Sequence, residues 1–374
     1  SEKIELDVFK NYIGQEENLS NILLKYDILC LMRERTPLTE NLINKLPNLK
    51  LVITSGMWNA SIDTNALKER NIVYCGTDTI IHSTAELAWA LIMNSWRGLQ
   101  TEIENMKNGK WQTTIGRGLK GNVLGIFGLG KQGKQVANFA KAFGMRVIAW
   151  SHNLSEEECK KINIEYVESL DLFKMSDILT IHTKLSDRTK GYIDKDNLKL
   201  MKKNSVIVNT SRGPIINEQD LINALNDGTI SCAALDVYDQ EPLPKDHILR
   251  QTKNTILTPH IGGSTREAQH NIGIEVANKL VHYSDNGTTQ MAVNFPMVNL
   301  PHLDKMLRFL HVHHNQPGVL AAINEVFTEN GANITGQYLQ TEGDIGYVVM
   351  DIEPKVDAKI ILQNSLIKNL NTGG

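Results

Sequence analysis

Short segments of almost wholly apolar, β-branched residues recur along the chain and alternate with longer segments whose apolar positions have a helical spacing. In the middle of the chain these short segments are 123–127, 146–150, 178–182, 206–209, 233–236 and 255–258. Strands buried on both faces of a parallel sheet have this composition, whereas half-exposed strands alternate apolar and polar residues. The pattern therefore predicts an α/β fold with a doubly wound parallel sheet.

Two long helices are predicted on either side of this central block. Ser83-Thr84-Ala85-Glu86 has the pattern of a capping box, so we expect the first helix to run from there to about residue 99. The second helix is expected at about 265–283. Two helices in these places indicate that one domain is inserted into another and that the chain crosses between them twice.

The domain boundaries follow from this arrangement. Two further strand-like segments, 28–32 and 51–54, precede the first long helix. We infer a Rossmann-type nucleotide-binding domain at residues 80–262. It is inserted into an outer, substrate-binding domain formed by residues 1–79 and 263–304.

The pattern changes again after the proline-containing stretch 294–301, in a third domain at residues 305–374. Strands are expected there at 308–313, 337–341 and 347–353, and helices at 319–330 and 357–370. This βαββα order predicts a ferredoxin-like βαββαβ module that lacks its last strand.

Composition narrows the range of partners and compartments. The 39 Lys and Arg residues against 42 Asp and Glu give a formal charge of −3, with no long run of one sign. We expect neither nucleic-acid nor membrane binding, and partners that are small molecules or further copies of the chain. Four cysteines without CxxC spacing indicate a reduced compartment and no metal site. The longest apolar run, 87–93, is too short to span a bilayer, so a cytoplasmic location is expected.

A glycine-rich motif carries the first chemical signal. Gly128-Leu129-Gly130-Lys131-Gln132-Gly133 fits the G-x-G-x-x-G pattern and lies between a predicted strand and a predicted helix. In this context the first glycine makes the turn, the second lets a pyrophosphate approach the backbone, and the third packs helix on strand. We expect a dinucleotide with its phosphates at the helix N-terminus, contacted by this motif and by Thr210.

The place that selects between NAD and NADP lacks its usual residue. An acidic residue about 20 positions after the glycines usually binds the ribose 2′-hydroxyl of NAD. Here the segment reads Trp150-Ser151-His152-Asn153. Ser151 or Asn153 can bind the ribose of NAD, while a protonated His152 would attract a 2′-phosphate. The residues therefore predict NAD and leave NADP open.

Three polar residues follow successive strand-like segments: Arg212, Glu241 and His260. Ligands bind at the carboxyl ends of strands in open α/β sheets, so these side chains are expected to converge. An arginine grips a substrate carboxylate with two hydrogen bonds, and a histidine exchanges the hydroxyl proton. A carboxylate beside the histidine orients the ring and favours its protonated form. Hydride transfer at C2 of a 2-hydroxy acid requires these groups.

With these motifs the chain resembles the D-isomer-specific 2-hydroxyacid dehydrogenases, an NAD-dependent oxidoreductase family. The Arg212, Glu241 and His260 motifs look like that family's catalytic trio. The resemblance implies a flavodoxin-like fold for the outer domain and a nicotinamide-binding role for Asp236. It also implies that the loop at 55–59, which includes Ser55 and Gly56, offers backbone N–H groups to the substrate carboxylate.

The C-terminal part is similar to the D-3-phosphoglycerate dehydrogenases of serine biosynthesis, and the last domain resembles an ACT regulatory domain. This implies 3-phosphoglycerate as substrate and a dimer or tetramer. It also implies regulation by L-serine or another amino acid, bound at His313, Asn315 and Asn333. The plainer alternative is that His311, His313 and His314 are solvated strand residues.

The N-terminal half leaves the substrate open. Arg33 and Arg35 retain two arginines of the family's R-S-R-T segment and suit a phosphate, whereas Ile80 replaces an asparagine of the phosphoglycerate enzymes. Ser151 and Ile80 together keep a glyoxylate or hydroxypyruvate reductase using NADP(H) as an alternative. A third possibility is a non-catalytic protein that senses a dinucleotide or an amino acid.

Overall fold

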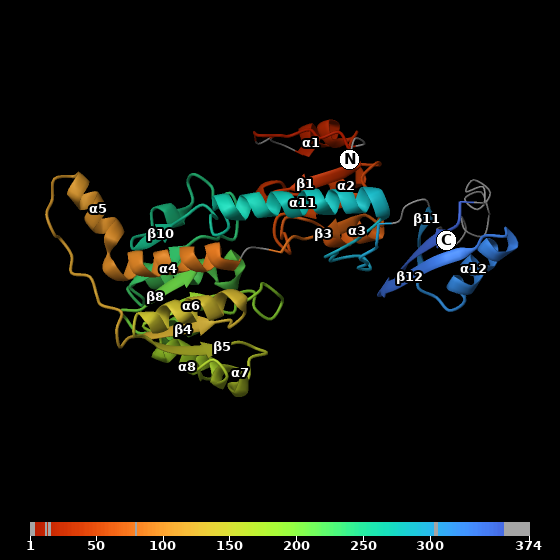
Figure 1. Cartoon of the computed structure of the whole chain (residues 1–374). Coiled ribbons are helices and arrows are strands. Elements are labelled where there is room, and N and C mark those ends of the chain that lie inside the picture. Colours follow the sequence, from red (N-terminus) through yellow and green to blue (C-terminus); the bar gives the residue numbers. More distant parts are fainter. Residues whose placement is uncertain (1–3, 12, 14–15, 79–80, 303–305, 355–374) are drawn as a thin grey trace. The chain divides into compact units, whose positions relative to one another are not determined.

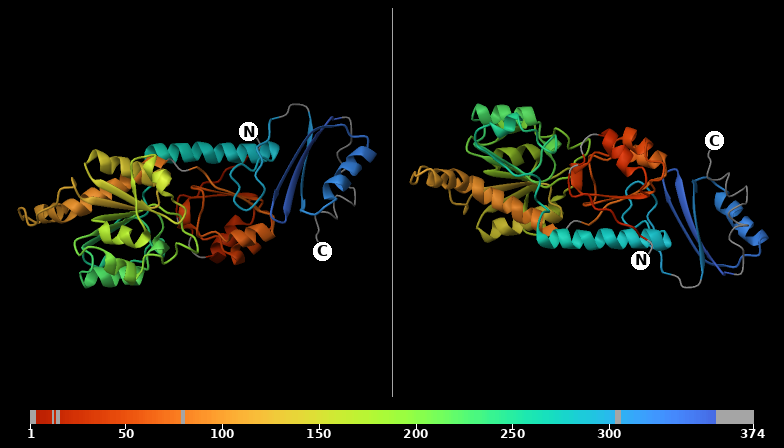
Figure 2. Two further views of the ribbon diagram at one scale, coloured as in Figure 1. Left: turned by 90° about the horizontal axis from the view of Figure 1, so that it is seen from below. Right: turned by 90° about the horizontal axis from the view of Figure 1, so that it is seen from above.

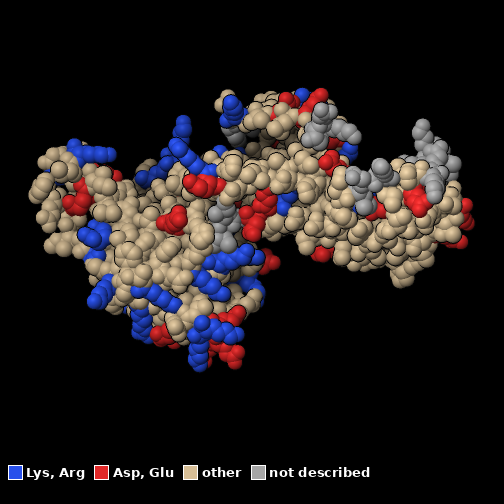
Figure 3. All heavy atoms as spheres, viewed as in Figure 1, with Lys and Arg blue, Asp and Glu red and all other residues tan. Residues whose placement is uncertain are grey.

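The structure of the chain is a computed structural model that describes residues 4–11, 13, 16–78, 81–302 and 306–354. It divides into two compact units. One contains residues 1–79 and 270–374, and the other contains residues 80–269 (Figure 1). Among the described residues no helix is long and apolar enough to cross a membrane. In the view of Figure 3, basic and acidic side chains lie close together over the unit at 80–269, whereas those seen on the C-terminal module are acidic.

The unit at 80–269 contains a seven-stranded parallel sheet in the order β10-β9-β8-β7-β4-β5-β6. Its strands are β4 (Val123–Phe127), β5 (Arg146–Trp150), β6 (Glu165–Tyr166), β7 (Ile178–Ile181), β8 (Val206–Asn209), β9 (Cys232–Leu235) and β10 (Thr255–Leu257). The helices and 3₁₀ turns are α4 (Ile81–Arg97), α5 (Leu99–Lys107), α6 (Lys131–Ala142), α7 (Glu156–Lys160), α8 (Ser169–Met175), α9 (Lys195–Leu200), η2 (Gly213–Ile215), α10 (Glu218–Asn226) and η3 (Ile248–Arg250). The predicted doubly wound class is confirmed.

Both faces of this sheet are buried, which explains the continuous apolar runs. Alternate residues of β4 enter different cores: Ile126 packs with α4 and α6, and Phe127 packs with α8, α9 and α10. Since neither face meets water, no polar residue interrupts the strand. The predicted capping box is misplaced, because α4 begins at Ile81 and Ser83 therefore lies inside the helix.

The other unit contains a parallel three-stranded sheet in the order β1-β2-β3 and a long helix. The elements of this part are α1 (Glu16–Leu23), β1 (Ile28–Leu31), η1 (Arg33–Arg35), α2 (Glu40–Asn44), β2 (Leu51–Thr54), α3 (Thr64–Glu69), β3 (Val73–Cys75) and α11 (Arg266–Asn286), whose first turn is assigned to the unit at 80–269. Thr39 and Asp63 cap α2 and α3 by accepting hydrogen bonds from backbone N–H groups, which fixes where these two short helices begin.

The C-terminal module has an antiparallel sheet in the order β11-β13-β12. Its elements are β11 (Leu307–His314), α12 (Val319–Glu329), β12 (Ile334–Glu342) and β13 (Ile345–Ile352). Figure 2 shows α12 along one face of the sheet, where Phe327 packs on Phe309. The helix predicted at 357–370 lies outside the described residues.

Candidate active site

The glycine-rich turn joins β4 to α6 and leaves room for a ligand at one position. Gly128 has φ +103°, and a Cβ there would lie 2.6 Å from the backbone nitrogen of Thr183. A Cβ on Gly133 would lie 2.2 Å from the carbonyl oxygen of Gly128, so the helix packs directly on the turn. A Cβ on Gly130 would meet nothing within 4 Å. The open space therefore lies at the N-terminus of α6, which begins at Lys131, where a pyrophosphate is stabilised.

Two buried polar atoms, at the ends of β7 and β8, have no partner among the described residues. Thr210 follows β8, is 6% exposed, and its Oγ1 makes no hydrogen bond. His182 follows β7, and its Nδ1 is also buried without a partner, while Nε2 lies 2.9 Å from Thr180 Oγ1. Burial lowers the pKa of His182 to about 4, so the ring is neutral at neutral pH. Unpartnered polar atoms at the carboxyl edge of the sheet fit a ligand rich in hydroxyl groups and amides.

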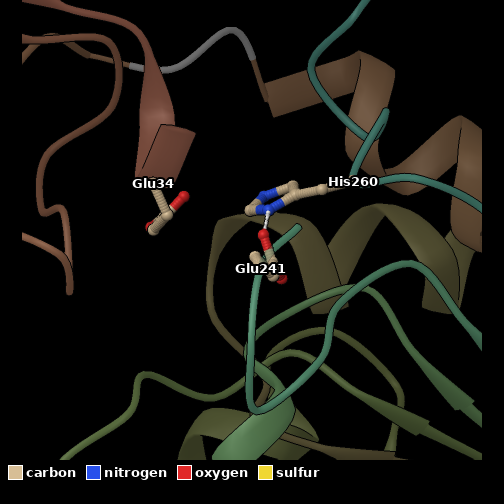
Figure 4. A group of neighbouring side chains, drawn as sticks. All are labelled: Glu34, Glu241 and His260. Carbon is tan, nitrogen blue, oxygen red and sulfur yellow. Dashed lines mark hydrogen bonds and ion pairs between the residues drawn. The ribbon is translucent and has the colours of Figure 1, made fainter. Parts of the chain in front are cut away.

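Glu241 and His260 form a hydrogen-bonded pair at the same edge of the sheet. They follow the neighbouring strands β9 and β10, and Figure 4 shows His260 Nδ1 bonded to the Glu241 carboxylate. The His260 side chain is 19% exposed and the Glu241 side chain is 17% exposed. The second oxygen of Glu241 accepts the backbone N–H of Tyr238 at 3.0 Å. Because Nδ1 is bonded to Glu241, proton exchange with a substrate falls to Nε2 of His260.

Asp236 holds the loop that carries His260. Its fully buried carboxylate accepts the hydroxyl of Thr258 at 2.6 Å and the backbone N–H groups of Ile261 and Gly262, both at 2.8 Å. His260 lies between these partners in the left-handed region, at φ +51°. That conformation is strained for a non-glycine residue and requires support from its surroundings. Burial raises the pKa of Asp236, although the three donors and His260 oppose this shift.

The arginine loop packs on the loop that carries Glu241. A Cβ on Gly213 would lie 2.0 Å from the carbonyl carbon of Tyr238, so only glycine allows this contact. The Tyr238 hydroxyl donates to the backbone carbonyl of Thr258 at 2.8 Å or to that of Leu235 at 3.1 Å, and so bridges β9 and the loop after β10. The partly buried Arg212 side chain donates to the carbonyl of Ser211 at 2.7 Å. Three adjacent strands therefore present the guanidinium, carboxylate and imidazole groups.

The structure assigns internal partners to two backbone groups of the predicted substrate loop. Ser55 N–H donates to the carbonyl of Leu31 at 3.0 Å, and Gly56 N–H donates to Thr77 Oγ1 at 2.7 Å. Donation of these two N–H groups to a substrate carboxylate, as expected from the sequence, is therefore not supported. They shape the loop instead. Arg35 is exposed within η1.

The remaining predicted substrate contacts are not described in full. Arg33 also lies in η1, but the structure does not describe its side chain. Ile80 lies outside the described residues. The proposed phosphate contacts therefore remain predictions.

The predicted effector residues occupy opposite ends of the C-terminal sheet. His313 and Asn315 lie at the end of β11, whereas Asn333 directly precedes β12, which runs parallel to β11 across β13. A strand rises about 3.3 Å per residue, so roughly 20–25 Å separate the two ends. A single copy does not bring the three residues together. The expectation of solvated histidines is wrong for His311 and His313, which are 8% and 7% exposed.

Sequence reasoning missed the residues that hold the site together. Gly213, Tyr238 and Thr258 each lie within a motif that carries a catalytic candidate. The signal that could have found these supporting residues is their position, because each lies within three positions of Arg212, Glu241 or His260. Their roles depend on contacts between different loops, which spacing along one segment does not reveal.

Comparisons with known proteins agree with this geometry. Residues 89–262 match the NAD-binding domain of the D-isomer specific 2-hydroxyacid dehydrogenases, and residues 309–369 match an AHAS small subunit-like ACT domain. The D-3-phosphoglycerate dehydrogenase of Escherichia coli K12 is 39% identical over 334 residues, which cover 87% of this chain and 80% of that protein. The Bacillus subtilis D-3-phosphoglycerate dehydrogenase is 32% identical, over 98% of this chain and 69% of that protein.

A solved structure also resembles this chain in fold. The phosphoglycerate oxidoreductase of Vibrio cholerae superposes with a TM-score of 0.70 at 32% identity, covering 74% of this chain and 90% of that one. The fold and the site define an oxidoreductase that uses NAD. The chain belongs to the D-isomer-specific 2-hydroxyacid dehydrogenase family.

Proposed function

We propose that the protein is a cytoplasmic D-3-phosphoglycerate dehydrogenase, which oxidises 3-phosphoglycerate to 3-phosphohydroxypyruvate in L-serine biosynthesis. The observation that carries the proposal is the His260–Glu241 pair at the carboxyl edge of the sheet. The choice of substrate rests on the identity to the Escherichia coli and Bacillus subtilis enzymes over most of the chain. The C-terminal ACT match is consistent with a biosynthetic enzyme under feedback control.

Each group of the trio has one task in this reaction. The Arg212 guanidinium binds the substrate carboxylate and polarises the oxygen on C2. Nε2 of His260 takes the proton from the C2 hydroxyl, and Glu241 stabilises the imidazolium that results. NAD, when bound, accepts the hydride that leaves C2. Removing the hydroxyl proton makes C2 a better hydride donor, so His260 lowers the activation free energy of hydride transfer.

The cofactor is held by the glycine-rich turn and the residues around it. The open backbone at Gly130 and the N-terminus of α6 would receive the pyrophosphate, with Lys131 and Gln132 in the first turn. Thr210 and the Ser151–His152 segment would bind the riboses. Asp236 holds the His260 loop, and its predicted contact with the nicotinamide carboxamide uses the same carboxylate. Arg33 and Arg35 would face the substrate phosphate.

We further propose that L-serine, or another amino acid, inhibits the enzyme by binding between C-terminal modules of two copies. The register of the sheet supports a site shared by two copies, because His313 and Asn315 lie at one end of the sheet and Asn333 at the other. The working form is therefore a homo-oligomer, a dimer or a tetramer. Effector binding is coupled to catalysis through motion at Gly262-Gly263.

A substrate panel tests the proposal. Initial rates are measured with 3-phosphoglycerate, glyoxylate and hydroxypyruvate, each with the NAD and NADP couples and with and without L-serine. We expect the highest kcat/KM for the phosphoglycerate pair and a rate that falls as serine is added. A preference for glyoxylate would replace the substrate assignment, and binding of NADH with no turnover of any hydroxy acid would refute the catalytic one. A flat serine response would remove the regulatory claim alone.

A further inference from the structure

The carboxyl end of β5 lies directly beside the glycine-rich turn. β4 and β5 pair in register up to Phe127 and Trp150, and Gly128 N–H donates to the carbonyl of Trp150 at 3.0 Å. The residues that follow, Ser151 and His152, therefore lie where the adenosine ribose of a dinucleotide is recognised. In NAD-selective sites a carboxylate at this place binds the ribose hydroxyls and repels a 2′-phosphate. Here the position holds a hydroxyl and an imidazole.

An aromatic wall holds the His152 ring in place. Trp150 and Tyr192 stack with ring centroids 5.3 Å apart and planes inclined by 20°. The His152 ring meets both edge-on, at 4.9 Å from Trp150 and 5.2 Å from Tyr192. Its Nε2 lies 3.3 Å from the carbonyl oxygen of Arg188. The imidazole is thus anchored on apolar rings while remaining exposed to a ligand.

The charged groups on the adjoining segments favour an anion. The loop after β7 carries three exposed basic residues and one exposed acid, Lys184, Arg188, Lys190 and Asp187. Two of the three acids of α7 have partners close by: Glu158 accepts from the backbone N–H and hydroxyl of Ser155, and Glu156 pairs with Lys160 at 2.7 Å. The third, Glu157, is exposed. The carboxylates of Glu156 and Glu158 are therefore already compensated within α7.

We propose that this site accepts a 2′-phosphate and that the enzyme binds NADP(H) as well as NAD(H). The Ser151 hydroxyl donates a hydrogen bond to the phosphate oxygens. Nε2 of His152 already donates to the carbonyl of Arg188, so the protonated ring donates to the phosphate from Nδ1. The basic loop after β7 adds attraction. The proposal rests on the dinucleotide site alone and is independent of which hydroxy acid is oxidised.

Calorimetric titration of the full chain with two fragments tests the proposal without catalysis. The fragments are ADP-ribose and 2′-phospho-ADP-ribose, which share the pyrophosphate and lack nicotinamide. We expect the two dissociation constants of the wild-type chain to agree within about tenfold, since a bidentate or charge-assisted contact offsets the cost of removing the phosphate from water. A preference of more than tenfold for ADP-ribose in the wild-type chain would overturn the proposal.

Two substitutions, at the half-buried Ser151 and the exposed His152, assign the effect to named residues. Ser151→Asp restores the carboxylate, and we expect it to weaken binding of the phosphorylated fragment by roughly 100-fold through charge repulsion while ADP-ribose binds at least as well. His152→Gln should weaken only the phosphorylated fragment, by about 3- to 10-fold. Asn223→Asp, on the exposed face of α10, is the control for added charge and should change neither constant. If Ser151→Asp leaves the ratio of the two constants unchanged, the proposal fails.

These outcomes are separable from the proposed function. Loss of phosphoglycerate turnover would leave the ratio of fragment affinities intact, and a failed ratio would leave the substrate assignment intact. Thermal unfolding of each variant, measured alongside, checks whether the substitutions at the half-buried Ser151 and the exposed His152 leave the fold unchanged.

Discussion

The Asp236 carboxylate and its three donors, Thr258, Ile261 and Gly262, form a clamp on the loop that carries His260. The substitution Asp236→Asn gives the sharpest prediction about this clamp. The asparagine oxygen can still accept from Thr258 and Ile261, but the amide NH₂ would face the backbone N–H of Gly262, which now donates to the carboxylate at 2.8 Å. Two donors then meet in a fully buried place. Losing a hydrogen bond to a charged acceptor and leaving a buried N–H unsatisfied costs about 1.5–3 kcal/mol.

This cost is comparable to the strain that the clamp supports. A non-glycine residue in the left-handed region, such as His260, costs on the order of 1–3 kcal/mol. Without the clamp the loop is free to relax, and each 1.4 kcal/mol lowers the population of the active arrangement tenfold. We therefore expect kcat to fall by about 10- to 100-fold. Thr258→Val is the matched variant: it removes one donor without creating a clash, and its kcat should fall by less than about tenfold.

Steady-state kinetics and denaturant unfolding over a pH series distinguish this role from a purely structural one. Burial raises the pKa of Asp236 in the folded state, so its contribution to stability is present below the unfolded pKa and is lost as pH rises through the folded pKa. The stability of the wild type relative to Asp236→Asn should accordingly decrease as pH rises from about 4 towards neutrality. A kcat for Asp236→Asn within twofold of wild type would refute the clamp.

Three further predictions follow from the contacts described above. Gly130→Ala should fold normally but bind NADH about 10- to 100-fold more weakly. Gly133→Ala should also be destabilised, because its Cβ would lie 2.2 Å from a carbonyl oxygen, and equal melting temperatures for the two variants would contradict this. Asp351 is 1% exposed, and Arg308→Met leaves it without its bidentate partner. The unfolding free energy measured in denaturant melts should fall by about 3–5 kcal/mol, and a loss below 1 kcal/mol would contradict burial of the pair. Burial lowers the pKa of His182 from 6.5 to about 4, so the stability that the neutral ring contributes is present above pH 6.5 and is lost as pH falls towards 4, by about 3 kcal/mol in total. Curves of unfolding free energy against pH that run parallel for wild type and His182→Asn would contradict this.

The parallel sheet could be predicted from the sequence because burial on both faces leaves a pattern that needs no long-range information. The strand at 123–127 was predicted with the bounds the structure gives, and the one at 178–182 ends one residue earlier, at Ile181. Strand ends carry the chemistry in such a sheet, so Arg212, Glu241 and His260 could be assigned to one edge from order alone. The hydrogen bond between Glu241 and His260 agrees with that assignment.

Contacts between segments far apart in the sequence explain what could not be predicted. The N–H groups of Ser55 and Gly56 bond to Leu31 and Thr77, and nothing in the local sequence of the loop indicates those partners. His311 looked solvated because histidine is polar, yet the module buries its side chain. The capping-box pattern at Ser83 matched the composition of a helix start, but α4 begins two residues earlier, at Ile81, and composition alone does not fix a helix end to within one or two residues.

The most direct test of the central claim is the rate of 3-phosphoglycerate oxidation by His260→Gln, measured as NADH formation in a single turnover. The glutamine keeps a hydrogen-bonding side chain next to Glu241 but cannot take a proton, and general base catalysis contributes about 10²- to 10⁴-fold. We predict a rate loss in that range, with the dissociation constant of NADH changed by less than threefold. A single-turnover rate equal to that of the wild type would contradict the assignment of His260 as the residue that removes the C2 hydroxyl proton.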